Sequence, residues 1–215
     1  MKKVGILGSG IVGQTLGSGF LKHGYEVMIG TRTASKLDEW KAGTNGKGQV
    51  GSFAETAAFG DLIVLAAKGA VAKLVLESAG AANLEGKIII DATNPIGNEP
   101  AENGVLKFFT SLDRSLMEDL QEGFPGGRFV KGWSSVGSAF MVNPSFESRP
   151  TMFICGSDPA AKQEVVQIMD TFGWDTSDMG GVEGARAIEP LCILWCIPGF
   201  LRNEWGHAFK LLQKS

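Results

Sequence analysis

The feature that most constrains the fold is a glycine-rich turn near the start of the chain. An apolar segment, residues 4–7, leads into Gly8-x-Gly10-x-x-Gly13, and a segment with helical periodicity follows. In this arrangement the first glycine makes the tight turn, the second lets the backbone approach a pyrophosphate, and the third lets the helix pack closely on the sheet. The order of strand, turn and helix therefore predicts a βαβ unit that binds a dinucleotide at a helix N-terminus. A glycine-rich turn without a ligand is the alternative.

The residues after the second expected strand distinguish NADP(H) from NAD(H). We expect the first helix over residues 11–23 and the second strand over residues 26–30. An NAD site would place Asp or Glu at the end of that strand, to bind the ribose hydroxyls. This chain has hydroxyl and basic side chains there: Thr31, Arg32, Thr33 and Lys36. Such groups would bind a 2′-phosphate that a carboxylate would repel, so the sequence predicts an NADP(H) site. A solvated basic loop is the alternative.

The rest of the chain alternates between expected strands and helices. Strands are expected over residues 61–66, 87–91, 128–131 and 151–155, and helices over residues 71–79, 111–122 and 158–172. A short edge strand near residues 174–177 and two C-terminal helices complete the chain. This pattern predicts an α/β fold of the Rossmann type, a doubly wound, mostly parallel sheet with a small C-terminal helical part. The strands at 151–155 and 174–177 are expected to belong to the same sheet.

Length, charge and cysteine content limit the remaining possibilities. The 215 residues suffice for a dinucleotide-binding domain, expected over residues 1–140, and a smaller C-terminal α/β extension over residues 141–215. The net charge of −3 and the lack of a basic stripe argue against nucleic-acid binding. Three cysteines without a disulfide framework favour a reducing, cytoplasmic location.

Ligands of doubly wound sheets bind at the carboxyl ends of the strands, where several loops of this chain are expected to meet. The glycine turn and the loop after the second strand form the cofactor half. The turn after residues 61–66 and the loops after residues 87–91 and 128–131 form the other half. The candidate cofactor-binding residues in these loops are Gly8, Ser9, Gly10, Ile11, Val12, Gly13, Thr31, Arg32, Thr33, Lys36, Ala67, Lys68, Asn94, Pro95, Ser134, Ser135 and Val136.

A convincing general acid is missing from the sequence. The single tyrosine, Tyr25, is followed four residues later by an isoleucine, so the Tyr-x-x-x-Lys acid of short-chain dehydrogenases is absent. Lys68, Lys131 and His207 are weak candidates, because lysine is usually solvated and the histidine lies in the tail. Reduction of a ketone or imine normally benefits from an acid, whereas hydride transfer between two redox rings does not need one. We therefore assign no catalytic residue and no metal ligand.

Cys192 and Cys196 lie four residues apart on one face of an expected helix, and no further cysteine or nearby histidine completes a metal site. Core packing is the preferred interpretation. The apolar segment around them, residues 191–197, is bracketed by Pro190 and Pro198 and is too short to span a bilayer. We expect it in the core or at a subunit interface, and we expect no membrane association.

Six segments together resemble a known family. They are residues 8–13, 30–33, 91–95, 130–137, 152–156 and 185–191. In these segments the chain is similar to the NADP oxidoreductases that use the deazaflavin coenzyme F420, and to the NADPH-binding module of the membrane metalloreductases. The resemblance covers essentially the whole chain and implies a Rossmann domain, a small C-terminal part and a homodimer.

The resemblance also implies roles for individual residues. Ser9, Ile11 and Val12 would face the pyrophosphate and nicotinamide, and Thr31, Arg32 and Lys36 would hold the 2′-phosphate. Ser134, Ser135 and Val136 would lie where the nicotinamide and the acceptor ring stack. The chain departs from the family in the acceptor half: Trp133-Ser134-Ser135 replaces Phe-Asn-Thr or His-Thr, and Ala67-Lys68 replaces Val-Pro.

We expect an NADPH-dependent oxidoreductase that transfers a hydride to coenzyme F420 or a flavin. A reductase of a small carbonyl or imine substrate is the first alternative, and it would need Lys68, Lys131 or a partner's His207 as acid. A non-catalytic NADPH-sensing module is the second alternative.

Overall fold

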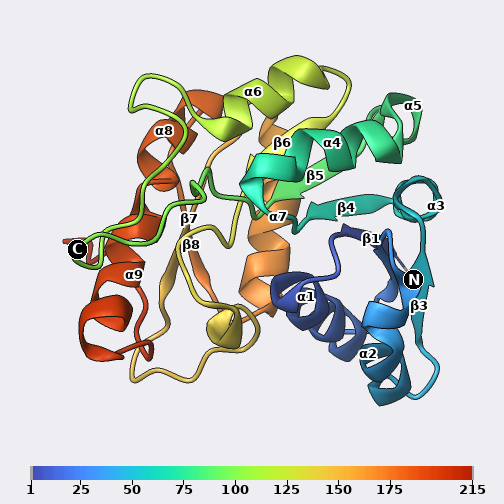
Figure 1. Cartoon of the computed structure of the whole chain (residues 1–215), viewed down its shortest axis with the longest axis horizontal. Helices are drawn as coiled ribbons and strands as arrows, with labels where there is room; N and C mark the ends of the chain where they lie inside the picture. Colours follow the sequence, from blue (N-terminus) through green and yellow to red (C-terminus); the bar gives the residue numbers. More distant parts are fainter. Residues whose placement is uncertain (1, 215) are drawn as a thin grey trace.

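The structure, a computed structural model, describes residues 2–214. Six parallel strands form the main sheet in the order β3-β2-β1-β4-β5-β6 (Figure 1). Their bounds are β1 Lys3–Leu7, β2 Glu26–Gly30, β3 Gly48–Gly51, β4 Leu62–Leu65, β5 Ile88–Asp91 and β6 Arg128–Lys131. This is the strand order of the Rossmann fold, which reverses direction between β1 and β4. The predicted fold class is therefore confirmed.

The register of the strands brings their carboxyl ends to one edge. Leu7 at the end of β1 pairs with Gly30 on one side and with Leu65 on the other. The row continues through Asp91 at the end of β5 to Lys131 at the end of β6. The loops that follow these strands consequently leave the sheet side by side.

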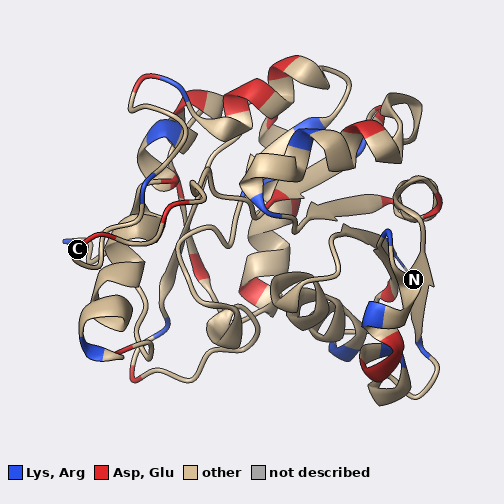
Figure 2. Ribbon diagram, viewed as in Figure 1, with Lys and Arg blue, Asp and Glu red and all other residues tan. Residues whose placement is uncertain are grey.

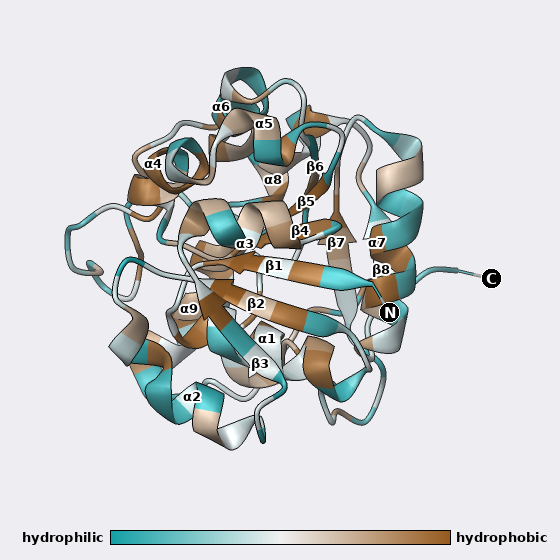
Figure 3. Ribbon diagram, turned by 90° about the vertical axis from the view of Figure 1, so that its right-hand side faces the viewer, coloured by the Kyte–Doolittle hydropathy of each residue, from teal (hydrophilic) through white to brown (hydrophobic). Residues whose placement is uncertain are grey.

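Helices cover both faces of the sheet because its buried strands alternate their side chains. Val64 belongs to the core cluster that also contains residues of α1 (Ile11–Lys22), α2 (Asp38–Gly43) and α7 (Pro159–Thr171), while the neighbouring Ile63 and Leu65 belong to the cluster of the opposite face. Figure 3 shows the hydrophobic strands enclosed between these helices. The opposite face carries α3 (Phe53–Phe59), α4 (Gly69–Ala79), α5 (Ala81–Leu84) and α6 (Leu116–Gly123).

Two elements, β3 and α3, were not predicted from the sequence. β3 has four residues, two of them glycine, so it lacks the apolar run that identifies the other strands. α3 did carry a signal, because Ser52 and Glu55 form a reciprocal capping box at its start. A serine followed three residues later by a glutamate is a sequence pattern that indicates the start of a helix, so this pattern could have located α3.

The two C-terminal strands do not join the main sheet, contrary to the prediction. β7 (Thr151–Ile154) and β8 (Asp175–Asp178) form a separate two-stranded parallel sheet. A single antiparallel bridge joins it to β6, where the Lys131 amide donates to the Cys155 carbonyl. The chain turns away directly after this bridge, because Trp133 adopts a φ of +57°. A longer ladder between β6 and β7 is thereby prevented.

The C-terminal helices are α8 (Ala185–Ile188) and α9 (Leu191–Arg202), as predicted in number. Pro190 caps α9 and Pro198 lies inside it, so the prolines do not bracket a short segment as expected. The helical run Val182–Arg202 is long and apolar enough, by length and composition alone, to cross a membrane. In this structure a third of its most apolar window is buried inside the protein.

A buried ion cluster joins the C-terminal helices to the sheet. The Lys131 Nζ lies 2.7 Å from Asp91 Oδ2 and 2.8 Å from Glu189 Oε1, and it donates to the Thr93 carbonyl at 2.9 Å. All three ionised side chains are almost completely buried. Burial opposes the charge of the lysine, but the two carboxylates outweigh it and raise the pKa of Lys131 above its ordinary value.

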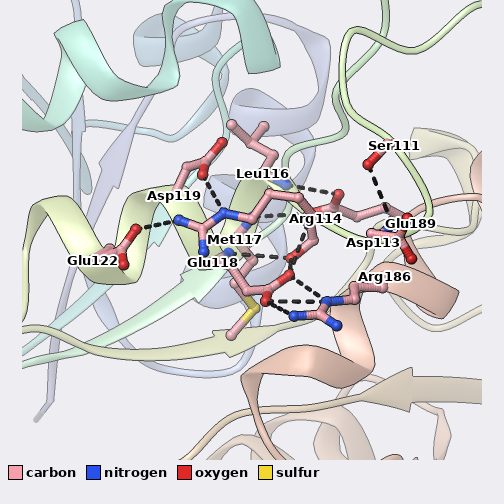
Figure 4. A network of polar contacts seen from close by, with 11 residues as sticks. Ser111, Asp113, Arg114, Leu116, Met117, Glu118, Asp119, Glu122, Arg186 and Glu189 are labelled. Carbon is pink, nitrogen blue, oxygen red and sulfur yellow. Dashed lines mark hydrogen bonds and ion pairs between the residues drawn. The ribbon is translucent and has the colours of Figure 1, made fainter.

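The N-terminal turn of α6 is held by carboxylates from two elements (Figure 4). Glu189, directly after α8, accepts hydrogen bonds from the backbone N–H groups of Leu116 at 3.0 Å and Met117 at 3.1 Å. Glu118 in α6 pairs through both oxygens with Arg186 of α8. The Arg186 guanidinium is the main reason that the pKa of Glu118 falls to about 2. Residues 185–191 thus connect α8 to α6 and to the sheet.

The ion cluster predicts a large loss of stability when its cation is removed. Lys131→Met leaves two carboxylates buried without their partner, and should lower the free energy of unfolding by about 3–5 kcal/mol. Denaturant unfolding would measure this loss. Lys210→Met, which removes an exposed pair with Asp175, should cost less than about 1 kcal/mol. Adding Glu189→Gln and Asp91→Asn to Lys131→Met should restore part of the loss, and equal losses for both lysine variants would contradict the prediction.

Candidate functional site

A cleft of about 570 Å³ lies at the carboxyl edge of the main sheet. It is bordered by the loops after β1, β2 and β4, by one face of α4 and by the residue that follows β5. Its volume is in the range of small-molecule and cofactor pockets. The predicted candidates that line it are Gly8, Ser9, Gly10, Ile11, Val12, Thr31, Arg32, Thr33, Lys36, Ala67 and Lys68.

The three glycines of the turn have different surroundings. Gly8 has a φ of +138°, and a Cβ atom there would lie 2.3 Å from the Ala66 carbonyl oxygen. A Cβ atom on Gly13 would lie 2.0 Å from the Gly8 carbonyl oxygen, so only glycine lets α1 approach the strand this closely. Gly10 differs from both, because no atom lies within 4 Å of its Cβ position. Gly10 therefore leaves open space in the cleft, whereas Gly13 packs the helix and does not line it.

The N-terminus of α1 faces the same open space. Gly10 caps this helix without a side-chain hydrogen bond, and its first turn carries no acidic residue. The helix has twelve residues, so its first N–H groups and its dipole favour an anion here. The arrangement fits the pyrophosphate of a dinucleotide.

The loop after β2 brings cationic side chains to the cleft. Arg32 and Lys36 both line it and are exposed to solvent. Neither forms an ion pair within residues 2–214, so both charges are free to meet an anionic ligand. Acidic side chains do not line the cleft in the part of the chain that the structure describes. The electrostatics of this end fit a 2′-phosphate.

The apolar wall of the cleft was not predicted from the sequence. Val71, Leu74, Val75 and Ser78 of α4 line it together with Phe53 of α3. A signal was present, because the α4 positions recur at intervals of three and four residues and so share one helix face. Part of that face is unpartnered, since the Leu74 side chain is 60 % exposed.

Five other candidates do not line the cleft. Asn94 and Ser134 do lie together as expected, because the Asn94 amide donates to the Ser134 carbonyl at 2.7 Å. Ser134 and Ser135 are almost completely buried, and Val136 packs in the core. Pro95 is also buried. The stacking of a ring on this loop stays a prediction, and Ala92 is the residue of the β5 end that reaches the cleft.

The candidate acids lie in three different environments. Lys68 is exposed and lines the cleft. Lys131 is enclosed in the ion cluster and does not reach it. His207 stacks on Trp195, and its Nε2 lies 2.9 Å from the Trp195 carbonyl oxygen. Of these three residues, only Lys68 lines the cleft within residues 2–214.

The cysteine thiols are free, and two of them are buried. Burial raises the pKa of Cys155 to about 12, so its thiol stays protonated and inert. Cys192 is buried as predicted, whereas Cys196 is partly exposed. Among residues 2–214, no three His, Cys, Asp or Glu side chains converge where they could hold a metal ion.

Comparisons with known proteins agree on the fold and the cofactor half. Residues 3–95 match the family described as "NADP oxidoreductase coenzyme F420-dependent". A crystal structure from Arthrobacter sp. fb24, described as a candidate F420-dependent NADP reductase, is 30 % identical. It covers 99 % of this chain, is itself covered completely, and superposes with a TM-score of 0.91.

More distant relatives share parts of this likeness. Metalloreductase STEAP3 of Rattus norvegicus is 29 % identical over 93 % of this chain, but the chain spans only 39 % of its length. An imine reductase of Streptomyces aurantiacus is 20 % identical with a TM-score of 0.68, covering 93 % of this chain and 63 % of that one. The second likeness shows the fold alone.

The open space at Gly10 yields a prediction that separates binding from stability. Gly10→Val should fill the approach to the α1 N-terminus and weaken NADPH binding by about tenfold or more, roughly 1.4 kcal/mol. Its thermal midpoint should change little, because no atom lies within 4 Å of the new Cβ. Calorimetric titration and thermal melting would measure the two quantities. Gly43→Val, also into open space but away from the cleft, is the matched control, and equal binding by both variants would contradict this assignment.

Proposed function

The chain belongs to the family of NADP oxidoreductases described as coenzyme F420-dependent, and we propose that it transfers a hydride between NADP(H) and the ring of a deazaflavin or flavin. The observation that carries the proposal is the chemistry of the cleft wall. Its titratable side chains are Arg32, Lys36 and Lys68, all cationic, and the rest of the wall is apolar or hydroxylic. The wall thus offers binding and orientation, with little acid–base chemistry.

This composition favours a redox ring as acceptor. Reduction of a carbonyl or imine gains about a hundredfold or more from a positioned acid. Transfer between two redox rings needs stacking and alignment, which the protein provides, while the rings carry the chemistry. A cleft with cationic anchors at one end and an apolar wall along α4 matches the second requirement.

The residues present fit NADP(H), and each group has a defined task. When bound, NADPH supplies the hydride from its nicotinamide. The glycine turn and the α1 N-terminus would hold the pyrophosphate, and Arg32 and Lys36 would hold the 2′-phosphate. Ile11 and Val12, at the start of α1, provide apolar surface beside the glycine turn. The proton that accompanies the hydride onto the acceptor comes from solvent.

The test is direct oxidation of NADPH by defined acceptors. Purified protein is mixed with NADPH and, in separate reactions, with coenzyme F420, FMN or riboflavin, and the reduced-nicotinamide absorbance is followed. Oxidation with at least one ring acceptor, dependent on the protein, is the expected result. Tight NADPH binding without oxidation by any of them would overturn the proposal and favour the NADPH-sensing alternative.

One observation supports a second candidate, the reductase of a small carbonyl or imine. Lys68 is exposed in the cleft and offers an ammonium group as proton donor. Turnover of small ketones or cyclic imines that is lost in Lys68→Ala would support this candidate. Lys73→Ala is the control, since Lys73 lies in α4, the helix that Lys68 directly precedes, but does not line the cleft.

We further propose that two copies of the chain associate through α9. Leu194, Phe200 and Leu201 are about half exposed on this helix. Residues 191–201 contain no charged side chain, and the helix is drawn without charge over most of its length (Figure 2). Interface cores between protein copies are similarly depleted of charge.

Leu194→Glu with Leu201→Glu should convert a dimer to a monomer in sedimentation, while Leu212→Glu in the tail should not.

The free thiols also bear on location. Cys155, Cys192 and Cys196 remain unpaired, which suits a reducing compartment, and we propose the cytoplasm. Detection of the protein in an oxidising compartment would contradict this.

Cofactor preference gives a separate prediction. Arg32→Ala should weaken NADPH binding by about 1.5–3 kcal/mol, the range for a charged hydrogen bond. NADH binding should barely change, because NADH has no 2′-phosphate. Titration of both cofactors would measure the difference, and equal losses for NADPH and NADH would show that Arg32 does not bind the phosphate.

A further inference from the structure

Two hydroxyl groups join the two loops of the cofactor half of the cleft. Ser9 lies in the glycine turn after β1, and Thr31 lies in the loop after β2, twenty-two residues away. Their oxygens, Ser9 Oγ and Thr31 Oγ1, are 3.0 Å apart, and both residues line the cleft. The contact therefore bridges the loop beside the pyrophosphate and the loop beside the 2′-phosphate.

The single proton of the Thr31 hydroxyl is engaged within the protein. Thr31 Oγ1 accepts from the Thr33 amide at 3.1 Å, and it lies within donating distance of the Thr33 carbonyl at 3.2 Å and of Ser9 Oγ at 3.0 Å. A hydroxyl has one proton, so whichever of these two oxygens receives it, none is left for a phosphate oxygen. Thr31 is also 9 % exposed, unlike the neighbouring Arg32 and Thr33, which are open to solvent.

Each end of this bridge is tied to an element of the site. The Ser9 carbonyl accepts a hydrogen bond at 2.9 Å from the side-chain amide of Gln14 in α1. On the other side, Thr33 precedes the short helix Ala34–Leu37, and its carbonyl accepts from the Lys36 amide at 3.2 Å. The bridge thus links the N-terminal part of α1 to the backbone that carries Lys36.

We propose that Thr31 is a positioning residue that couples the pyrophosphate loop to the 2′-phosphate loop, and not a ligand of the phosphate. This inference rests on the proposed function only in requiring that the cleft binds NADP(H). A ligand of the 2′-phosphate would affect NADPH alone. A residue that fixes both loops affects NADPH and NADH alike, because both cofactors need the pyrophosphate loop in place.

The first test compares the two cofactors in variants of Thr31. Thr31→Val keeps the shape but removes the hydrogen bonds, and should raise the Kd for NADPH and for NADH by a similar factor, about tenfold. Thr31→Ser keeps the hydroxyl and should bind both cofactors within about threefold of the unmodified chain. A selective loss of NADPH binding in Thr31→Val, as expected for Arg32→Ala, would overturn the proposal.

The second test uses a ligand that reaches one loop only. Adenosine 2′-monophosphate carries the 2′-phosphate but no pyrophosphate. Ser9→Ala should weaken its binding about threefold, although Ser9 lies in the other loop, and Thr31→Val should then add little further loss. Unchanged binding in Ser9→Ala, or fully additive losses, would overturn the coupling.

The two proposals fail in distinguishable ways. If the unmodified chain does not bind NADPH in titration, both are overturned. If it binds NADPH but oxidises it with no ring acceptor, the proposed function fails while the Ser9 and Thr31 measurements still decide the coupling. Thermal midpoints of Ser9→Ala and Thr31→Val within a few degrees of the unmodified chain confirm that the folded protein was compared.

Discussion

The rest of the structure depends on the buried ion pairs that Lys131 forms with Asp91 and Glu189. The Lys131 ammonium group lies between Asp91 at the end of β5 and Glu189 after α8, and the α6 N-terminus donates to Glu189 from the other side. One cation faces two carboxylates, and the backbone N–H groups of α6 offset the excess negative charge. Buried ions are tolerated only when all are paired, so these elements must assemble together. The cluster therefore sets where the C-terminal helices meet the sheet.

This arrangement connects the C-terminal part to the cofactor cleft. Asp91 also accepts hydrogen bonds from the amide and hydroxyl of Thr93, and Lys131 donates to the carbonyl of the same residue. The turn after β5 is thus fixed from both sides, and Ala92 within it lines the cleft. The neighbouring Gly69 packs against this turn so closely that a Cβ atom would lie 2.1 Å from the Asn94 carbonyl oxygen. Glu189, within residues 185–191, therefore helps to fix a turn that lines the cleft, although Glu189 itself does not line it.

Several elements with a local signal were identified from the sequence, although the capping box of α3 and the cleft face of α4 were missed. The glycine turn, the apolar strands and the Asp158–Pro159 start of α7 each carry their own pattern, and the structure has them where expected. Prediction from the sequence failed where the outcome depends on distant contacts. Nothing local shows that Lys131 would be enclosed by Glu189, fifty-eight residues later, or that β7 would meet β6 by one bridge only. The burial of Ser134 and Ser135 is of the same kind, since it follows from the turn at Trp133 and from the packing behind it.

Trp133 sets the path of the backbone on the acceptor side of the cleft. Its φ of +57° is strained for a bulky residue, by roughly 1–2 kcal/mol, and the strain is offset by packing. The indole ring is almost completely buried against Phe20 and Phe172, with ring centroids 6.1 Å and 5.4 Å away. The indole of Trp133 therefore lies in the core and does not line the cleft. Its effect on the acceptor side is indirect, because it sets the path of the backbone that places Ser134 beside Asn94, while the cationic residues and Gly8 and Gly10 line the NADP(H) side.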